Sequence, residues 1–152
     1  MSFSKFKTII LVGFMLLGFF SCKKLELLTG NQSVLEQYFS DNVLNRNFVV
    51  DFASDNGTDI TSQYKDYNFV LSKGSSVYGG KLTGTKNGVS YDGSWSTTDD
   101  FSRLVIDLSK SGNPNEFIFL NRTWKFTKKT PPVLQLEPYG SAEDKVLYMR
   151  RL

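Results

Sequence analysis

The stretch that decides the fold covers residues 87–96 and reads Asn-Gly-Val-Ser-Tyr-Asp-Gly-Ser-Trp-Ser. It opens with Asn87-Gly88, a dipeptide typical of a two-residue β-hairpin turn. Polar residues then alternate with a second set that shares the other side of the chain: Val89, Tyr91, Gly93 and Trp95. An alternation of period two predicts a strand that packs on one face and meets water on the other.

The same pattern extends in both directions from this stretch. Apolar residues alternate with polar ones on either side of it, and turn residues separate the runs. Asn56-Gly57 predicts another hairpin, Lys73-Gly74 predicts a tight turn, and Pro131-Pro132 ends a run because proline cannot donate to a ladder. The sequence predicts eight strands, at residues 46–54, 66–73, 76–83, 89–96, 102–109, 122–129, 132–137 and 145–151.

Eight short strands can form a sandwich or a closed barrel. The mostly short connections favour an up-and-down order, so we expect an all-β, eight-stranded, antiparallel up-and-down barrel over residues 33–152. A barrel of this size is either filled by side chains or holds one small ligand. The alternation does not show which face of the last strand, around Val146 to Met149, points inward.

One short helix is expected before the strands. Ser33 and Glu36 have the spacing of a capping box, and apolar residues follow at helical intervals: Val34, Leu35, Tyr38 and Phe39. A stripe of this kind usually packs on the body of its own domain, although it could also bind a partner.

The N-terminal segment has the layout of a secretory signal over residues 1–21. Lys5 and Lys7 precede an uncharged apolar run at residues 9–20, which is shorter than the about 20 residues of a membrane span. Ser21 and then Cys22, the only cysteine, follow this run. We therefore expect acylation at Cys22, with palmitate among the attached chains, and a tether over residues 22–32. The alternative is an unpaired thiol inside a discarded signal.

Composition excludes several kinds of chemistry. The chain contains no histidine and one cysteine, so histidine-based catalysis, an intramolecular disulfide and cysteine zinc sites are excluded. The net charge of +3 falls to about +1 without Lys5 and Lys7, which gives no electrostatic basis for binding nucleic acid. A hairpin explains residues 55–59 more simply than a calcium loop does. Asp99-Asp100 is interpreted as a solvated turn. No residue pattern in the sequence predicts a cofactor site, so we expect no cofactor.

The chain resembles the lipocalin-like lipoproteins common in Bacteroidota. Ser21-Cys22 is similar to the lipobox of such lipoproteins, and the remaining likeness covers most of residues 48–151. It rests on Asp59, Thr61, Tyr67, Phe69, Gly93, Trp95, Leu104, Ile106, residues 120–124, Leu134 and Leu136. Classical lipocalins carry Gly-x-Trp on the first strand, whereas here it falls on the fourth. The resemblance implies a small barrel anchored at the outer membrane, on its periplasmic face or at the cell surface.

Three functions follow as hypotheses. The first is a barrel that binds a small apolar or amphipathic ligand, with four candidate lining residues: Tyr91, Trp95, Trp124 and Phe126. Aromatic residues on the inner face of strands are, however, more often core packing than ligand contacts. The second is a protein-interaction lipoprotein, either a hydrolase inhibitor or an accessory subunit of an envelope complex. An enzyme is the third, and we expect no catalytic residues. An internal cavity would favour the first hypothesis, and a filled interior with an exposed aromatic patch would favour the second.

Overall fold

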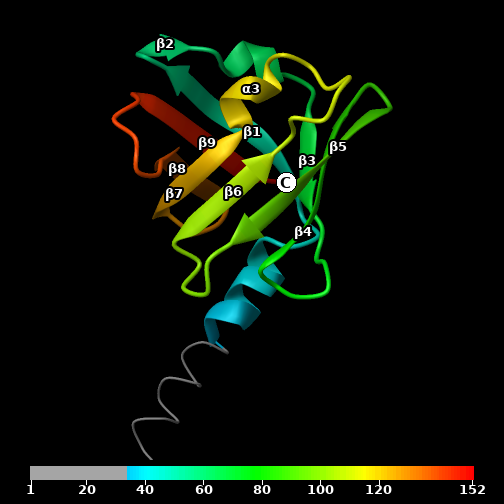
Figure 1. The fold of residues 1–152 in the computed structure, drawn as a ribbon, viewed down its shortest axis with the longest axis vertical. Helices are drawn as coiled ribbons and strands as arrows, with labels where there is room; N and C mark the ends of the chain where they lie inside the picture. Colours follow the sequence, from blue (N-terminus) through cyan, green and yellow to red (C-terminus); the bar gives the residue numbers. More distant parts are fainter. Residues whose placement is uncertain (1–33) are drawn as a thin grey trace, which may run out of the picture. The chain divides into compact units, whose positions relative to one another are not determined.

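The computed structural model describes residues 34–152, which form a closed antiparallel β-barrel with short helical segments (Figure 1). A helix covers residues 34–42. The strands are β1 (Asn47–Asp55), β2 (Thr58–Asp59), β3 (Asn68–Leu71), β4 (Gly79–Lys86), β5 (Val89–Thr97), β6 (Arg103–Asp107), β7 (Arg122–Lys128), β8 (Val133–Pro138) and β9 (Lys145–Arg151). The other helical segments are the 3-10 helix η2 (Thr61–Tyr64) and α3 (Phe117–Leu120). The expected signal, Cys22, the tether and Ser33 lie outside the described residues.

The barrel closes by pairing its first strand with its last. From β3 to β9 each strand pairs with the next along the chain, β1 pairs with β3, and every pairing is antiparallel. β1 also pairs with β9, from Phe48 opposite Arg151 to Asp55 opposite Lys145. The short β2 pairs with the last residues of β1 in a hairpin and is not one of the eight barrel strands. The predicted eight-stranded up-and-down barrel is therefore confirmed.

Two of the predicted hairpin turns have the expected geometry. Asn56 and Gly57 have φ of 50° and 76°, and Asn87 and Gly88 have φ of 52° and 78°. Positive φ at both central residues defines a type I′ turn, whose twist matches that of the flanking strands. Asn and Gly are the residues that adopt this backbone at the lowest cost.

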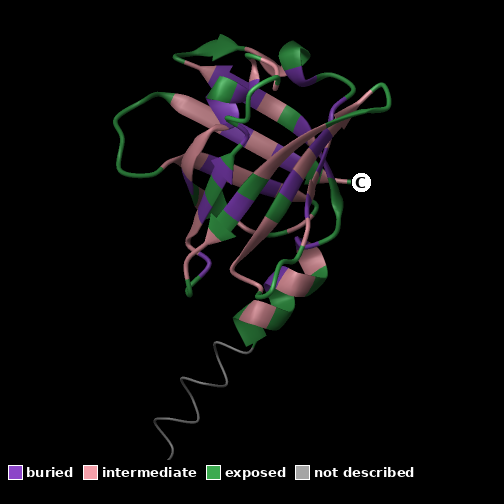
Figure 2. Ribbon diagram, turned by 45° about the vertical axis from the view of Figure 1, so that its right-hand side comes forward, coloured by how far each residue is buried: buried purple, intermediate pink, exposed green. Residues whose placement is uncertain are grey.

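The predicted inner faces are also confirmed. The exposed fraction is at most 3% for six residues predicted to share the apolar faces of their strands: Phe69, Leu104, Ile106, Trp124, Leu134 and Leu136. Figure 2 shows the resulting alternation of buried and less buried positions along the ribbons. Leu147 and Met149 give the inner face of β9, which the sequence left open. Val89 departs from the pattern: 52% of it is exposed, because the β4–β5 hairpin extends beyond the end of its neighbour β6.

One predicted connection is wrong. Lys73-Gly74 does not form a tight turn; residues 72–78 form a longer loop, and the strand predicted at 76–83 starts instead at Gly79. The loop folds back onto β4, where the Gly74 N–H donates to the Gly79 carbonyl at 3.0 Å. A Cβ on Gly80 would lie 2.1 Å from the Ser72 carbonyl oxygen. Only a glycine at this position allows the loop to approach so closely.

The helix of residues 34–42 packs on the barrel, as the first interpretation of its apolar stripe expects. Phe39 is 4% exposed, and its ring centroid lies 4.7 Å from Phe101 and 5.8 Å from Trp95. Val43 and Leu44, just after the helix, are also buried. Val34, Leu35 and Tyr38 remain exposed, so Phe39 is the one residue of the predicted apolar stripe that the barrel covers.

Candidate functional site

The two tryptophans predicted to line a ligand cavity lie in the packed core. Trp95 is 2% exposed and Trp124 is fully buried. Each indole N–H donates to a backbone carbonyl at 2.9 Å, from Trp95 to Ser72 and from Trp124 to Leu120. Since a buried indole needs one acceptor, both rings are satisfied without a ligand.

The other two predicted lining residues lie in different parts of the barrel. The Tyr91 ring stands edge-on to Phe117 at 5.6 Å and lies 6.1 Å from Tyr67. Phe126 lines a small apolar recess under the helix of residues 34–42, with Phe101 and Leu134 among its other walls. The recess has a volume of about 20 Å³, which is room for about one water molecule. The structure thus does not gather the four candidates around one cavity.

Both ends of the barrel are closed by buried side chains. Phe39 covers one end from the helix of residues 34–42. At the other end α3 inserts Phe117 and Leu120, whose exposed fractions are 0% and 1%. The sequence did not predict α3, because one turn of helix is too short to show a periodic pattern.

Hydrogen bonds hold the end covered by α3 in place. The hydroxyl of Tyr64 donates to the backbone carbonyl of Glu116 at 2.6 Å, and that of Tyr67 donates to the Glu116 carboxylate at 2.8 Å. Burial and the Glu116 charge raise the pKa of both tyrosines above the ordinary value. Both therefore stay protonated and act as donors that fix the cap.

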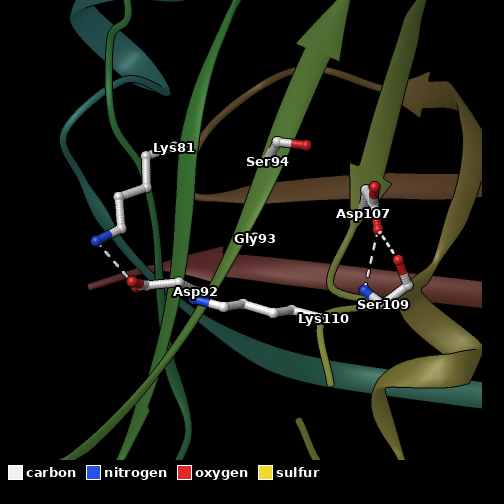
Figure 3. Close-up of a pocket in the computed structure, with 7 residues that line it drawn as sticks. All are labelled: Lys81, Asp92, Gly93, Ser94, Asp107, Ser109 and Lys110. Atoms are coloured by element: carbon white, nitrogen blue, oxygen red, sulfur yellow. Dashed lines mark hydrogen bonds and ion pairs between the residues drawn. The ribbon is translucent and has the colours of Figure 1, made fainter. Parts of the chain in front are cut away.

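The outer face of the barrel carries a larger polar recess, here called the β5–β6 recess. Its volume is about 510 Å³. Residues from β4, β5, β6 and the segment after β6 line it (Figure 3): Lys81, Asp92, Gly93, Ser94, Asp107, Ser109 and Lys110. The sequence placed Asp92, Gly93, Ser94 and Asp107 on alternating strands, but it gave no sign that they line a recess.

The recess exists because β6 leaves β5 at Asp107. The Asp107 carboxylate accepts hydrogen bonds from the Ser109 N–H at 3.0 Å and the Ser109 hydroxyl at 2.5 Å. The Leu108 N–H donates to the side-chain oxygen of Asn121 at 2.5 Å. These local bonds take the donors that would continue the ladder, so β6 ends.

Gly93 allows β5 and β6 to approach closely just before they separate. A Cβ on Gly93 would lie 2.1 Å from the Asp107 carbonyl oxygen and 2.9 Å from a methyl carbon of Leu108. Real Cβ atoms essentially never come so close to another atom. Glycine is therefore required by the close backbone approach and not by a turn.

The charges of the recess are partly compensated. Lys81 and Asp92 form an ion pair at 2.9 Å on exposed side chains, which contributes little to stability. Hydrogen bonds from Ser109 lower the pKa of Asp107 below its ordinary value. Lys110 has no ion pair within residues 34–152. The lining side chains offer charges and hydroxyl groups that can form ion pairs and hydrogen bonds with a bound molecule.

Two other acidic segments are parts of turns. Asp100 accepts hydrogen bonds from the Thr98 hydroxyl at 2.6 Å and the Ser102 N–H at 3.0 Å, which lower its pKa to about 2. Asp59 accepts the Thr61 N–H at 2.8 Å, beside the hairpin at residues 55–58. Across the described part of the chain, no group of three or more acidic residues could hold a metal ion.

Comparison with known proteins adds no relative. No protein-family model, curated protein or solved structure matches this chain. Within residues 34–152 no helix is long and apolar enough to cross a membrane.

Proposed function

We propose that this protein is a lipid-anchored envelope protein that binds another protein through the outer surface of its barrel and performs no catalysis. The observation that carries the proposal is the filled interior. Both tryptophans are buried with their N–H groups satisfied, and both ends are closed by Phe39 and Phe117. A ligand of even a few carbon atoms would have to displace core side chains, and native-density cores have few voids larger than water.

The anchoring part of the proposal rests on the sequence. A twelve-residue apolar run followed by Ser21 and the only cysteine, Cys22, supports acylation at Cys22. Acyl chains bind bilayers at about 0.8 kcal/mol per buried CH₂, so two or more chains give a stable anchor. The resemblance to lipocalin-like lipoproteins supports the outer membrane as its location.

The other hypothesis, a small apolar ligand inside the barrel, has weaker support. The recess beside Phe126 has a volume of about 20 Å³, far below the roughly 300–1,000 Å³ of ordinary ligand sites. The β5–β6 recess is larger but polar and open, and its residues offer hydrogen bonds and charges. These are the groups that the surface of another protein would meet.

In-cell cross-linking tests the proposed binding. A photoreactive benzoylphenylalanine placed at Ser90 or Ser94, both exposed on β5, should give one discrete adduct with an envelope protein. The same residue at Lys128, which is exposed on β7, serves as the matched control. Adducts absent from every exposed position tested around the barrel would refute a protein-binding role.

Labelling with an alkyne analogue of palmitate tests the anchor in the same cells. The wild-type protein should carry the label and sediment with membranes, whereas Cys22→Ser should lose the label. Label retained by the Cys22→Ser variant would refute acylation at this residue and leave the cross-linking result to stand on its own.

A further inference from the structure

The C-terminal half of β5 has a neighbouring strand on both sides. The first residues of β5 have a neighbouring strand on one side only, so their other edge is open. β5 and β6 pair only from Ser94 opposite Asp107 to Thr97 opposite Leu104. β5 and β4 pair along the whole length of β5, down to Val89 opposite Lys86. The end of the β4–β5 hairpin therefore extends past β6, as Figure 1 shows. Residues 89–92 have a neighbouring strand on the β4 side only.

The type I′ turn determines which backbone groups lie on the open edge. In a two-residue hairpin the residues that flank the turn, here Lys86 and Val89, exchange both ladder bonds. By alternation Tyr91 also directs its N–H and carbonyl to β4, and Ser90 and Asp92 direct theirs away from it. The Asp92 carbonyl accepts the Asn113 side-chain N–H at 3.2 Å. Among the hydrogen bonds of the described residues, none occupies the outward N–H or carbonyl of Ser90 or the N–H of Asp92.

The segment that follows β6 would pair with this edge if β6 continued, but it turns away. Continuing the β5–β6 register places Ser109 opposite Asp92. The Ser109 N–H donates to Asp107 instead, and the chain leaves toward α3. The β5–β6 recess opens at the point of separation, with Asp92 on one side and Ser109 and Lys110 on the other. A row of unpaired donors and acceptors beside an open recess is a template for an added strand.

We propose that the edge of β5 from Ser90 to Asp92 binds an extended segment of a partner polypeptide as an additional β-strand. Main-chain hydrogen bonds to Ser90 and Asp92 hold the segment, and an acidic side chain of the segment pairs with Lys110. This inference rests on the proposed protein-binding function and names its site and the form of its partner. Strand addition of this kind derives its affinity from backbone bonds and its specificity from side chains beside the edge.

A polypeptide segment suits this edge better than a second copy of the barrel does. The edge offers three free backbone groups, whereas a stable dimer needs an interface of at least about 1,000 Å². A short extended segment can use those few bonds and add side-chain contacts in the recess. The unpaired charge of Lys110 favours a segment that carries a carboxylate.

Proline at Ser90 provides a selective test. Ser90→Pro removes only the outward N–H, because Ser90 makes no ladder bond to β4, and proline is tolerated on an open edge. Ser90→Ala is the matched control, since it keeps the N–H. The full chain, purified in detergent, is used to select binders from a phage-displayed library of random ten-residue peptides. Calorimetry then measures the affinity of the enriched peptides for each variant.

The enriched peptides should contain Asp or Glu. Ser90→Pro should weaken their binding by at least about tenfold, whereas Ser90→Ala should change it by less than about twofold. Lys110→Glu should weaken binding by about threefold or more at low salt, and Lys128→Glu, on another strand, should not. Bound peptide should slow hydrogen exchange at the amides of Ser90 and Asp92.

Three results of the peptide experiment would overturn the inference. These are a library that yields no binder, peptides that bind Ser90→Pro as tightly as the wild type, and exchange protection confined to other strands. A dimer that forms without peptide and dissociates in Ser90→Pro would also overturn it, because the occupant would then be a second copy. The proposed function fails separately, when in-cell cross-linking gives no partner adduct from any face of the barrel.

Discussion

Replacing Gly93 by alanine tests the structural origin of the β5–β6 recess. The new Cβ would lie 2.1 Å from the Asp107 carbonyl oxygen, whereas ordinary contact begins at 3.4 Å, so β6 must move by about 1 Å. Overpacking of this kind costs about 1–3 kcal/mol. The movement also weakens the two ladder bonds between Ser94 and Asp107, each contributing about 0.5–1.5 kcal/mol.

A smaller term acts in the opposite direction. Alanine restricts the unfolded chain more than glycine does, which stabilises the folded state by about 0.4–1 kcal/mol. The net loss for Gly93→Ala is therefore about 3 kcal/mol in the free energy of unfolding, within a range of about 1–5 kcal/mol. Gly93→Val should cost more, because its branched side chain brings two further carbon atoms to the same place.

Urea denaturation followed by tryptophan emission measures this loss. With a slope of about 1–3 kcal/mol per molar urea, the midpoint should fall by about 1.5 M in Gly93→Ala. Ser94→Ala is the control on the neighbouring exposed position and should change stability by less than about 0.5 kcal/mol. A Gly93→Ala midpoint equal to that of Ser94→Ala would show that the close approach of β5 and β6 does not exist.

Three further predictions follow from named hydrogen bonds. Asn121→Ala removes the acceptor of the Leu108 N–H and should cost about 1–3 kcal/mol in urea denaturation, while Asn121→Asp, which keeps an acceptor, should cost less; equal losses would refute this role. The raised pKa of Tyr64 stabilises the folded state fully below pH about 10, and this contribution is lost as pH rises further. Tyr64→Phe should therefore show a shallower fall of the melting temperature between pH 9 and 12 (rough limits), and an unchanged fall would contradict the assignment. The pKa of Asp100, lowered to about 2, stabilises the fold above pH about 4, and this contribution is lost as pH falls toward 2. Asp100→Asn should lessen the acid-induced fall of the melting temperature, and a steeper fall would contradict it.

The fold could be predicted from sequence because its signals are local. The alternation around Trp95 and the Asn87-Gly88 dipeptide fixed a strand and a turn whose geometry depends mainly on neighbouring residues. The loop at residues 72–78 could not be predicted in this way. Its course depends on the Trp95 indole bond to the Ser72 carbonyl and on the close approach of Gly80, which join residues distant in the chain.

Less of the candidate site than of the fold could be predicted from the sequence. Alternation placed Trp95 and Trp124 on the inner face correctly, but it could not show whether that face surrounds space or other side chains. The answer depends on Phe39 and α3, which close the two ends from separate segments. The β5–β6 recess depends on Asp107 and Asn121 capturing backbone donors, and an isolated Asp or Asn in a sequence gives no sign of such a role.

The measurement that tests the central claim most directly is a fluorescence titration of residues 33–152, prepared without lipid, with palmitate. Trp95 and Trp124 are the only tryptophans, and both lie inside the barrel. If the interior is filled, their emission should be blue-shifted and should show no saturable change as palmitate is added. A saturable change that a recess-filling Leu134→Phe substitution abolishes, in a protein that still unfolds cooperatively, would show that the barrel opens to hold a ligand and would contradict the account.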